Sequence, residues 1–227
     1  MKKYIVFLSI VITVLTACTN DKKGSAVIPP QITNVDFSAE SYAFGEEVIM
    51  TIHSKGIALP LSTVSIKSIL DEKYSVGEGR VRAYGYDATS EYRVKAPLIA
   101  KMNNTKMKFL MQLEDIEGNS STSEASVEIV RPILPLLYIV MQDGNIKIMN
   151  RSAVNPDIFT IRLDLPKAAQ VRFISRLDET GFNWGWSAGD NIIVIGELNN
   201  FIPLGNSTED NYQIEFNIYD FSVKCQL

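Results

Sequence analysis

Alternation of apolar and polar residues dominates the chain from residue 32 to residue 131. In residues 106–114 every second side chain is apolar, and the same period of two recurs in 48–52 and 125–129. This is the pattern of strands that bury one face. Turn residues that include glycine, as in 115–119, separate the runs. About seven short strands in roughly one hundred residues, with no helical period, predict a β-sandwich.

The pattern is interrupted at residues 132–135. Pro132 and Pro135 frame a short apolar segment there, and proline can neither donate to a strand ladder nor sit inside a long helix. The sequence therefore predicts a domain boundary with a stiff joint.

Strand signals resume in residues 136–227. An apolar run at 137–141, a turn at 143–145 and renewed alternation at 146–149 predict a hairpin. Near the end, the apolar positions change phase between Asn217 and Tyr219, which requires a bulge or a tight turn. Further strands are expected at 159–165, 171–177 and 192–195. The expected fold class is all-β, with two tandem β-sandwich domains.

The first 17 residues have the pattern of an export signal. Lys2 and Lys3 precede an apolar run at 4–16, which is too short to span a bilayer comfortably. The run ends in Leu-Thr-Ala-Cys, which resembles the lipobox of bacterial lipoproteins. The resemblance implies that residues 1–17 are a cleaved lipoprotein signal peptide and that Cys18 carries the lipid. The alternative is an ordinary signal peptide or an uncleaved anchor helix, in which Cys18 is incidental.

Residues 18–31 have no periodicity. They are polar and small at first and end near Pro29-Pro30, a composition typical of an extended linker. We expect a flexible tether between the lipid and the folded part.

The charge balance excludes some partners. The chain has 22 basic and 26 acidic residues, and removal of the signal peptide takes away two of the lysines. A weakly acidic body has no basic footprint for nucleic acid or anionic lipid. With Cys18 lipidated, Cys225 has no partner for a disulfide, so apolar packing must hold the core together.

Candidate catalytic groups are sparse. His53 is the single histidine, and no Gly-x-Ser-x-Gly or Cys-x-x-Cys motif occurs, which argues against a Ser-His-Asp triad or a histidine-rich metal site. The acidic pairs at 178–179 and 209–210 offer the carboxylates that a glycosidase needs, but adjacent acids in turns are usually solvated. Residues 115–119 offer oxygens to calcium, although a plain β-turn is the simpler interpretation. We expect no enzymatic activity, no metal and no cofactor.

The most distinctive segment is 178–186, which contains both tryptophans. In an extended conformation Phe182, Trp184 and Trp186 share one face. Flat aromatic rings can stack on the C–H faces of sugars, and polar neighbours can bind the hydroxyls. The alternative is that the tryptophans fill the core. The expected carbohydrate-binding residues are Trp184, Trp186, Asn183, Arg176 and Asp190.

Both halves of the chain resemble known modules. By strand pattern, length and its closing Glu-Gly-Asn turn, the segment 32–131 resembles the immunoglobulin-like or PKD-like modules of bacterial surface proteins. The second half combines a Leu-Tyr-Ile-Val strand, the segment Gly-Phe-Asn-Trp-Gly-Trp and the closing run 211–223. It is similar to the β-sandwich modules of SusE and SusF type, which are starch-utilisation outer-membrane lipoproteins of glycan-degrading Gram-negative bacteria. The resemblance implies that residues 136–227 form a carbohydrate-binding module. The chain departs from that family in having one such module where two or three are usual.

These observations lead to two expected functions. The first is a lipid-anchored outer-membrane protein at the cell surface that binds a polysaccharide or oligosaccharide, without catalysis, for a glycan-uptake system with an outer-membrane transporter. The alternative is a structural or assembly lipoprotein whose sandwiches dock such a transporter or act as spacers. The alternative predicts that both tryptophans are buried.

Overall fold

The computed structural model describes residues 28–197 and 199–227. The predicted signal peptide at 1–17, Cys18 and most of the tether at 18–31 lie outside the described residues. Within the described part the regular structure consists of 17 strands and no helix, which confirms the predicted all-β class. Accordingly, no described segment forms a helix that is long and apolar enough to cross a membrane.

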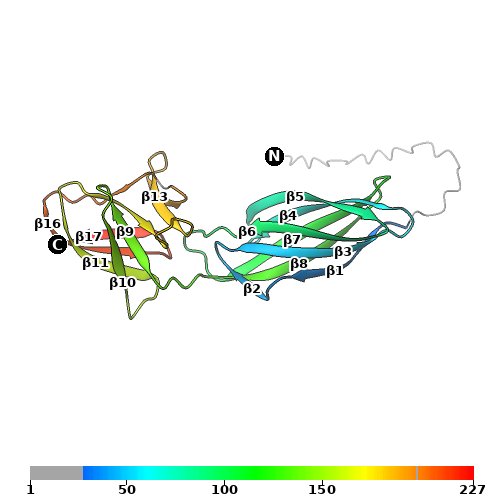
Figure 1. Cartoon of the computed structure of the whole chain (residues 1–227), viewed down its shortest axis with the longest axis horizontal. Coiled ribbons are helices and arrows are strands. Elements are labelled where there is room, and N and C mark those ends of the chain that lie inside the picture. Colours follow the sequence, from blue (N-terminus) through cyan, green and yellow to red (C-terminus); the bar gives the residue numbers. More distant parts are fainter. Residues whose placement is uncertain (1–27, 198) are drawn as a thin grey trace, which may run out of the picture.

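Strands β1 to β8 form an N-terminal sandwich of two sheets (Figure 1). One sheet has the order β1-β3-β6 and the other the order β2-β8-β7-β4-β5. The strand bounds are β1 Gln31–Phe37, β2 Ser41–Ala43, β3 Glu47–Lys55, β4 Leu61–Leu70, β5 Tyr74–Gly85, β6 Asp87–Lys95, β7 Thr105–Asp115 and β8 Ser120–Val130.

The two sheets bury alternate side chains between them, as the period of two in β3 and β7 predicts. Phe109 of β7 is fully buried, and its ring meets Tyr92 of β6 edge-on at 6.4 Å between centroids. The Tyr92 ring also lies against Gly79 of β5, where a Cβ would collide with it. The Ser68 hydroxyl donates to the Tyr92 hydroxyl at 3.4 Å. Tyr92 thus fills the space that glycine leaves open in the facing sheet.

Strands β9 to β17 form a second group, with the order β14-β13-β12-β9-β10-β11-β16-β17. Strand β15 pairs with β12 beside this path. The bounds are β9 Leu137–Met141, β10 Ile146–Arg151, β11 Ile158–Leu165, β12 Gln170–Ile174, β13 Asn183–Ser187, β14 Ile192–Ile195, β15 Ile202–Pro203, β16 Asp210–Asn217 and β17 Ser222–Gln226.

This C-terminal sandwich is one continuous sheet that folds into two layers at β10. Residues Ile146 to Met149 of β10 pair with β9, whereas Asn150 and Arg151 pair with β11. The layers meet where Phe173 of β12 stacks on Phe216 of β16, with 4.1 Å between ring centroids.

The predicted phase change near the C-terminus is a tight turn between two strands. Strand β16 ends at Asn217, whose side-chain oxygen accepts from the Tyr219 N–H at 2.9 Å. The Asp220 carboxylate accepts from the Ser222 N–H at 3.0 Å, where β17 begins. Two short side chains therefore satisfy the backbone of the turn.

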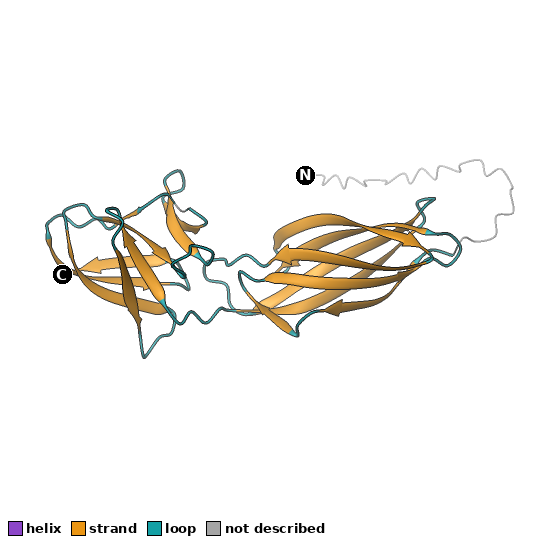
Figure 2. Ribbon diagram, in the orientation of Figure 1, coloured by secondary structure: helices purple, strands orange, loops and turns teal. Residues whose placement is uncertain are grey.

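Figure 2 shows the two sandwiches end to end, with the segment after β8 passing between them. Because strands β1–β8 and β9–β17 hydrogen-bond in separate sheets, the strand partners change across residues 131–136. The residue bounds of the two domains stay a prediction.

Candidate functional site between the two sandwiches

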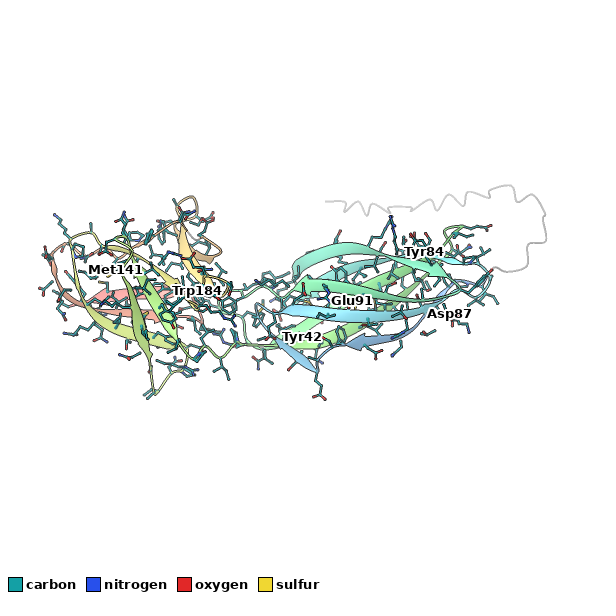
Figure 3. All side chains as sticks on the ribbon, in the orientation of Figure 1. Tyr42, Tyr84, Asp87, Glu91, Met141 and Trp184 are labelled. Atoms are coloured by element: carbon teal, nitrogen blue, oxygen red, sulfur yellow. The ribbon has the colours of Figure 1, made fainter. Side chains whose placement is uncertain are left out.

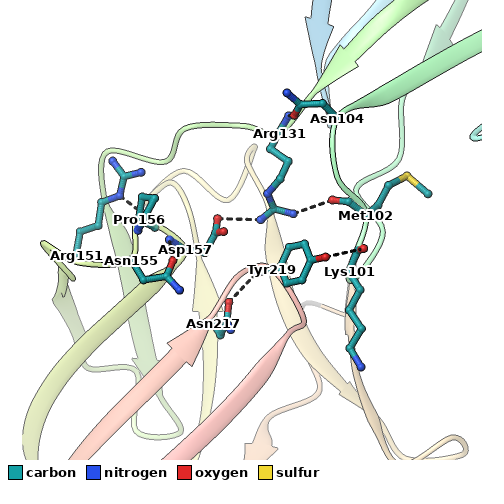
Figure 4. Close-up of polar contacts among 10 residues, drawn as sticks. All are labelled: Lys101, Met102, Asn104, Arg131, Arg151, Asn155, Pro156, Asp157, Asn217 and Tyr219. Carbon is teal, nitrogen blue, oxygen red and sulfur yellow. Dashed lines mark hydrogen bonds and ion pairs between the residues drawn. The ribbon is translucent and has the colours of Figure 1, made fainter.

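Arg131 is the central residue of the joint (Figure 4). Its guanidinium donates to the Met102 carbonyl at 3.0 Å and to Asp157 Oδ1 at 2.9 Å. The guanidinium also lies 4.8 Å from the centre of the Tyr219 ring, a cation–π contact. The Arg131 N–H donates to Asn104 Oδ1 at 2.9 Å. One arginine therefore connects loops of both sandwiches.

Tyr219 makes a second connection, also drawn in Figure 4. Its carbonyl accepts from the Lys101 N–H at 2.6 Å, and its hydroxyl donates to the Lys101 carbonyl at 3.1 Å. The turn between β16 and β17 is thereby held against the loop between β6 and β7.

Phe182 makes a third connection. Its ring packs directly on Gly45 of the N-terminal sandwich, so that a Cβ at Gly45 would collide with it. Gly45 has a φ of +91°, a conformation that favours glycine for backbone reasons as well. Glycine is therefore required at position 45 for two reasons, the close approach of the Phe182 ring and the positive φ.

The contact between Phe182 and Gly45 lies in the wall of a cleft of about 800 Å³, here called the interdomain cleft. The joint contributes exposed apolar side chains to it, and Ile133 is 79% exposed. The second sandwich contributes Leu177, which is 59% exposed. The lining residues are Ala43–Glu46 and Lys95 from the first sandwich, Pro132–Leu136 from the joint, and Tyr138, Ser175–Asp178 and Thr180–Phe182 from the second.

The loop at residues 175–182 forms the wall of the cleft on the C-terminal sandwich, and hydrogen bonds fix its shape. The Ser175 hydroxyl accepts from the Phe182 N–H at 2.7 Å. The Asn183 amide donates to the carbonyls of Glu179 and Gly181 at 2.9 and 3.3 Å. Because its ends and middle are tied down, the loop presents Arg176 and Leu177 to the cleft at little further entropic cost.

Charges of both signs border the cleft. Lys95 and Arg176 are basic, and Glu46 and Asp178 are acidic. The Thr180 N–H and hydroxyl donate to Asp178 at 3.1 and 2.8 Å. These bonds, assisted by the positive charge of Arg176, hold the pKa of the Asp178 carboxyl below its ordinary value. An ionised acid and a neighbouring arginine beside apolar surfaces suit a ligand with both hydroxyl groups and C–H faces.

Trp184 does not belong to this or any other exposed surface (Figure 3). Its side chain is 0% exposed, and its ring meets Phe216 and Phe221 nearly edge-on, at 5.5 and 6.2 Å between centroids. This corrects the expectation that Trp184 offers a stacking face to a sugar. Phe182, Trp184 and Trp186 do pack on one side of the sheet, but that side faces the core.

The other expected site residues do not gather around Trp184. Trp186 is partly buried against the core, and Asp190 accepts from the Ser187 hydroxyl at 3.0 Å within the β13–β14 turn. Asn183 is buried and ties the 175–182 loop. Only Arg176 lines the interdomain cleft. The predicted cluster is therefore divided among a core, a turn and a cleft wall.

The cleft as a whole has no signature in the sequence, because its residues come from segments far apart in the chain. The available signal was the joint itself, where Ile133 stands between Pro132 and Pro135 and Leu136 follows Pro135. Apolar side chains in a linker usually contact another surface, since a linker that is fully solvated favours polar residues.

Other features of the described residues carry less chemistry. No group of three or more His, Cys, Asp or Glu side chains in the described part is placed to hold a metal ion. His53 lies on the surface beside Asp36, with 3.2 Å between its Nε2 and the carboxylate. A larger concavity of about 1040 Å³ lies over β4, β5, β7 and β8, but its charged side chains already have partners. Lys67 pairs with Glu78, Glu124 pairs with Lys108, and Arg80 donates to the Ser65 hydroxyl.

Comparisons with known proteins establish no family. No family model matches the chain, and no curated protein matches it. Among solved structures, SusF from Bacteroides thetaiotaomicron is similar at 12% identity and a TM-score of 0.36, over 84% of this chain and 51% of that one. The chain thus spans about half of SusF.

Two further structures show the same low level of similarity. The sporulation control protein Spo0M from Bacillus subtilis has 10% identity and a TM-score of 0.38, over 86% of this chain and 94% of that one. A candidate carbohydrate-binding protein from Bacteroides ovatus has 10% identity and a TM-score of 0.23, over 81% and 64%. At these identities and TM-scores, the likenesses carry no conclusion about function.

Proposed function

We propose that the chain is a non-catalytic lipoprotein of the outer membrane that binds a polysaccharide or oligosaccharide at the cell surface, for uptake by a transporter. Its binding site is the interdomain cleft, in place of the tryptophan cluster expected from the sequence. The observation that carries this proposal is the cleft itself, whose volume of about 800 Å³ lies in the usual range for ligand sites.

The chemistry of the cleft supports a sugar ligand. Leu177, Ile133 and the Tyr138 ring offer apolar surface for the C–H faces of a sugar ring, and all three line the cleft. Arg176 and Asp178 stand beside them as a donor and an acceptor for hydroxyl groups. Lipid attachment at Cys18, which resembles a lipobox cysteine, would keep many copies on one surface and raise the avidity of weak sites.

The test is affinity electrophoresis of the mature chain in gels that contain a panel of polysaccharides. We expect at least one polysaccharide to retard the wild type. The Arg176→Ala, Leu177→Ser double variant should weaken binding about tenfold, which corresponds to a loss of about 1.4 kcal/mol. Both side chains are exposed, so the fold should persist.

Two control variants locate the site. Arg162→Ala removes an exposed arginine of β11 that does not line the cleft, and it should leave retardation unchanged. Trp186→Ala probes the tryptophan segment. If Trp186→Ala abolishes retardation while the cleft variant binds normally, the cleft assignment is wrong.

A second function is favoured by the burial of Trp184 and by the contacts across the joint. A structural or assembly lipoprotein needs two firmly coupled sandwiches and no exposed tryptophan. Failure of every polysaccharide in the panel to retard the wild type would favour this function over glycan binding.

A further inference from the structure

Three turns meet at the end of the N-terminal sandwich that lies opposite the joint. The Gly56 N–H donates to the Tyr86 carbonyl at 2.7 Å, and the Ile116 N–H donates to the Pro60 carbonyl at 3.0 Å. The β3–β4 loop is thus bound to both the β5–β6 turn and the β7–β8 turn. Strand β1 also begins at this end, because Gln31 pairs with Lys55.

Exposed apolar and aromatic side chains gather on this end and are here called the end patch. Their exposed fractions range from 37% to 66%. The members are Ile28, Ile57, Tyr84, Tyr86 and Ile116. Figure 3 labels Tyr84 at this end of the molecule.

The end patch holds nearly all the exposed large apolar residues of the N-terminal sandwich. In the described residues 28–130, Tyr74 is the one such residue outside it, 43% exposed at the β4–β5 turn. Single exposed apolar residues are ordinary on protein surfaces, but a cluster at one end of a sandwich indicates an interaction surface.

The position of Cys18 indicates what the end patch contacts. Ten residues lead from Cys18 to Ile28, and even fully extended they reach about 35 Å at most. A lipid on Cys18 would therefore keep this end of the sandwich, rather than the cleft end, close to the bilayer. Tyrosine suits that position, because its ring favours the headgroup region while its hydroxyl stays hydrated.

The charges around the end patch permit such a contact. Lys55 and Asp87 are register partners at the ends of β3 and β6, so their charges offset each other. Glu117, exposed beside Ile116 in the β7–β8 turn, adds one negative charge, so the patch would contact a membrane through its apolar and aromatic side chains and not by attracting anionic lipid. Ile57, Tyr86 and Ile116 lie in turns, Ile28 precedes β1, and Tyr84 is the penultimate residue of β5. All five are thus at or beyond strand ends, where side chains can enter a headgroup layer without disturbing a strand ladder.

We propose that the end patch rests on the lipid surface and acts as a second, non-covalent membrane contact beside the lipid on Cys18. This inference rests on the proposed lipid anchor. The contact orients the N-terminal sandwich on the membrane, which a lipid on Cys18 alone does not do.

The test uses the mature lipidated chain in vesicles of phosphatidylethanolamine with a minor fraction of phosphatidylglycerol. A Cys225→Ser background leaves a single reactive thiol in each of three labelled variants, Tyr84→Cys, Tyr86→Cys and Tyr74→Cys. Each thiol carries an environment-sensitive fluorophore, and phospholipids with a nitroxide at the headgroup or upper acyl chain act as quenchers. Tyr74→Cys is the matched control, since it is an exposed tyrosine of the same sandwich outside the patch.

We expect the labels at positions 84 and 86 to be quenched several-fold more strongly than the label at position 74. Equal quenching at all three positions, in chains that float with the vesicles, would overturn the patch contact and leave the anchor standing. A chain that does not float with the vesicles would overturn the anchor and this inference together. A label at position 84 that responds to soluble polysaccharide and not to lipid would mark the patch as a glycan surface and overturn the proposal.

Discussion

At the scale of single residues, Asp115 illustrates how a buried charge is held in the turn between two strands, at the end of β7. Its Oδ1 accepts from the N–H groups of Glu117 and Asn119 at 2.9 and 3.0 Å, and its Oδ2 accepts from the Asn119 amide at 2.9 Å. Burial by itself raises the pKa of the Asp115 carboxyl, but these donors and the Gly118 N–H together keep the pKa below its ordinary value. The Asp115 carboxylate oxygens, which were considered above as calcium ligands, therefore stabilise a β-turn.

Asp115→Asn should lower the free energy of unfolding by about 1–3 kcal/mol at neutral pH. The introduced amide group would point its N–H donors at the N–H donors of the Asn119 amide, inside a buried turn. The folded pKa lies below the unfolded value of about 3.9. The contribution of the charge is therefore complete above that value and is lost as the pH falls through the folded pKa. Urea unfolding at several pH values should show the gap between wild type and variant narrowing below about pH 4.

Asp143→Asn is the matched control for this turn. Asp143 accepts from the Asn145 N–H and amide at 2.9 and 2.6 Å, but it is exposed. Water can replace its lost bonds, so the cost should be smaller. Equal losses of unfolding free energy for Asp115→Asn and Asp143→Asn would contradict the role of burial.

At the scale of elements, alternation predicts strands well where both inward and outward positions carry ordinary side chains. It identified β3, β7 and β8 for this reason. Strand β5 has no such signal because its inward positions include Gly77 and Gly79, and Tyr92 from β6 fills the space above them. The apolar group that completes the β5 face therefore lies in another strand.

Strand β13 shows a second limit of the same pattern. Alternation correctly placed Trp184 and Trp186 on one face, but it cannot say which face is buried when both faces of a strand are covered. On the outer face, a Cβ at Gly185 would collide with the carbonyls of Glu197 and Asn200. The chain around these carbonyls covers that face, so the opposite face, which carries Trp184 and Trp186, is the one that packs on the core.

Trp184→Ala should cost about 3–5 kcal/mol of unfolding free energy, because it removes a fully buried indole between facing layers. Trp186→Ala should cost clearly less, since Trp186 is only partly buried. Urea unfolding followed by circular dichroism compares the two. If Trp184→Ala is the milder change, the indole is not part of the core packing.

At the scale of the whole molecule, the interdomain cleft depends on how the sandwiches are docked. Its walls come from the segments 43–46, 132–138 and 175–182, and no local pattern in any of these predicts that they meet. The contacts of Arg131, Tyr219 and Phe182 bring them together. The candidate site could not be predicted from the sequence for the same reason.

Gly45→Ala should alter the angle between the sandwiches, because its methyl group would displace the Phe182 ring. Gly118→Ala is the control: Gly118 has a similar φ of +84°, but a Cβ there meets nothing within 4 Å. Both variants carry backbone strain, and only the first disturbs the docking. Small-angle X-ray scattering should show a changed distance distribution for Gly45→Ala alone. Identical curves for both variants would mean that the Phe182 contact does not set the angle.

The length of the N-terminal sandwich also limits which molecules can reach the interdomain cleft. Strand β5 has 12 residues, and β7 and β8 have 11 each, so the sandwich is about 35–40 Å long at roughly 3.3 Å per residue. If the end patch rests on the bilayer, the cleft stands at about that height above it. Molecules that lie flat among the headgroups are then out of reach, and the cleft samples long chains that project from the surface or arrive from the medium.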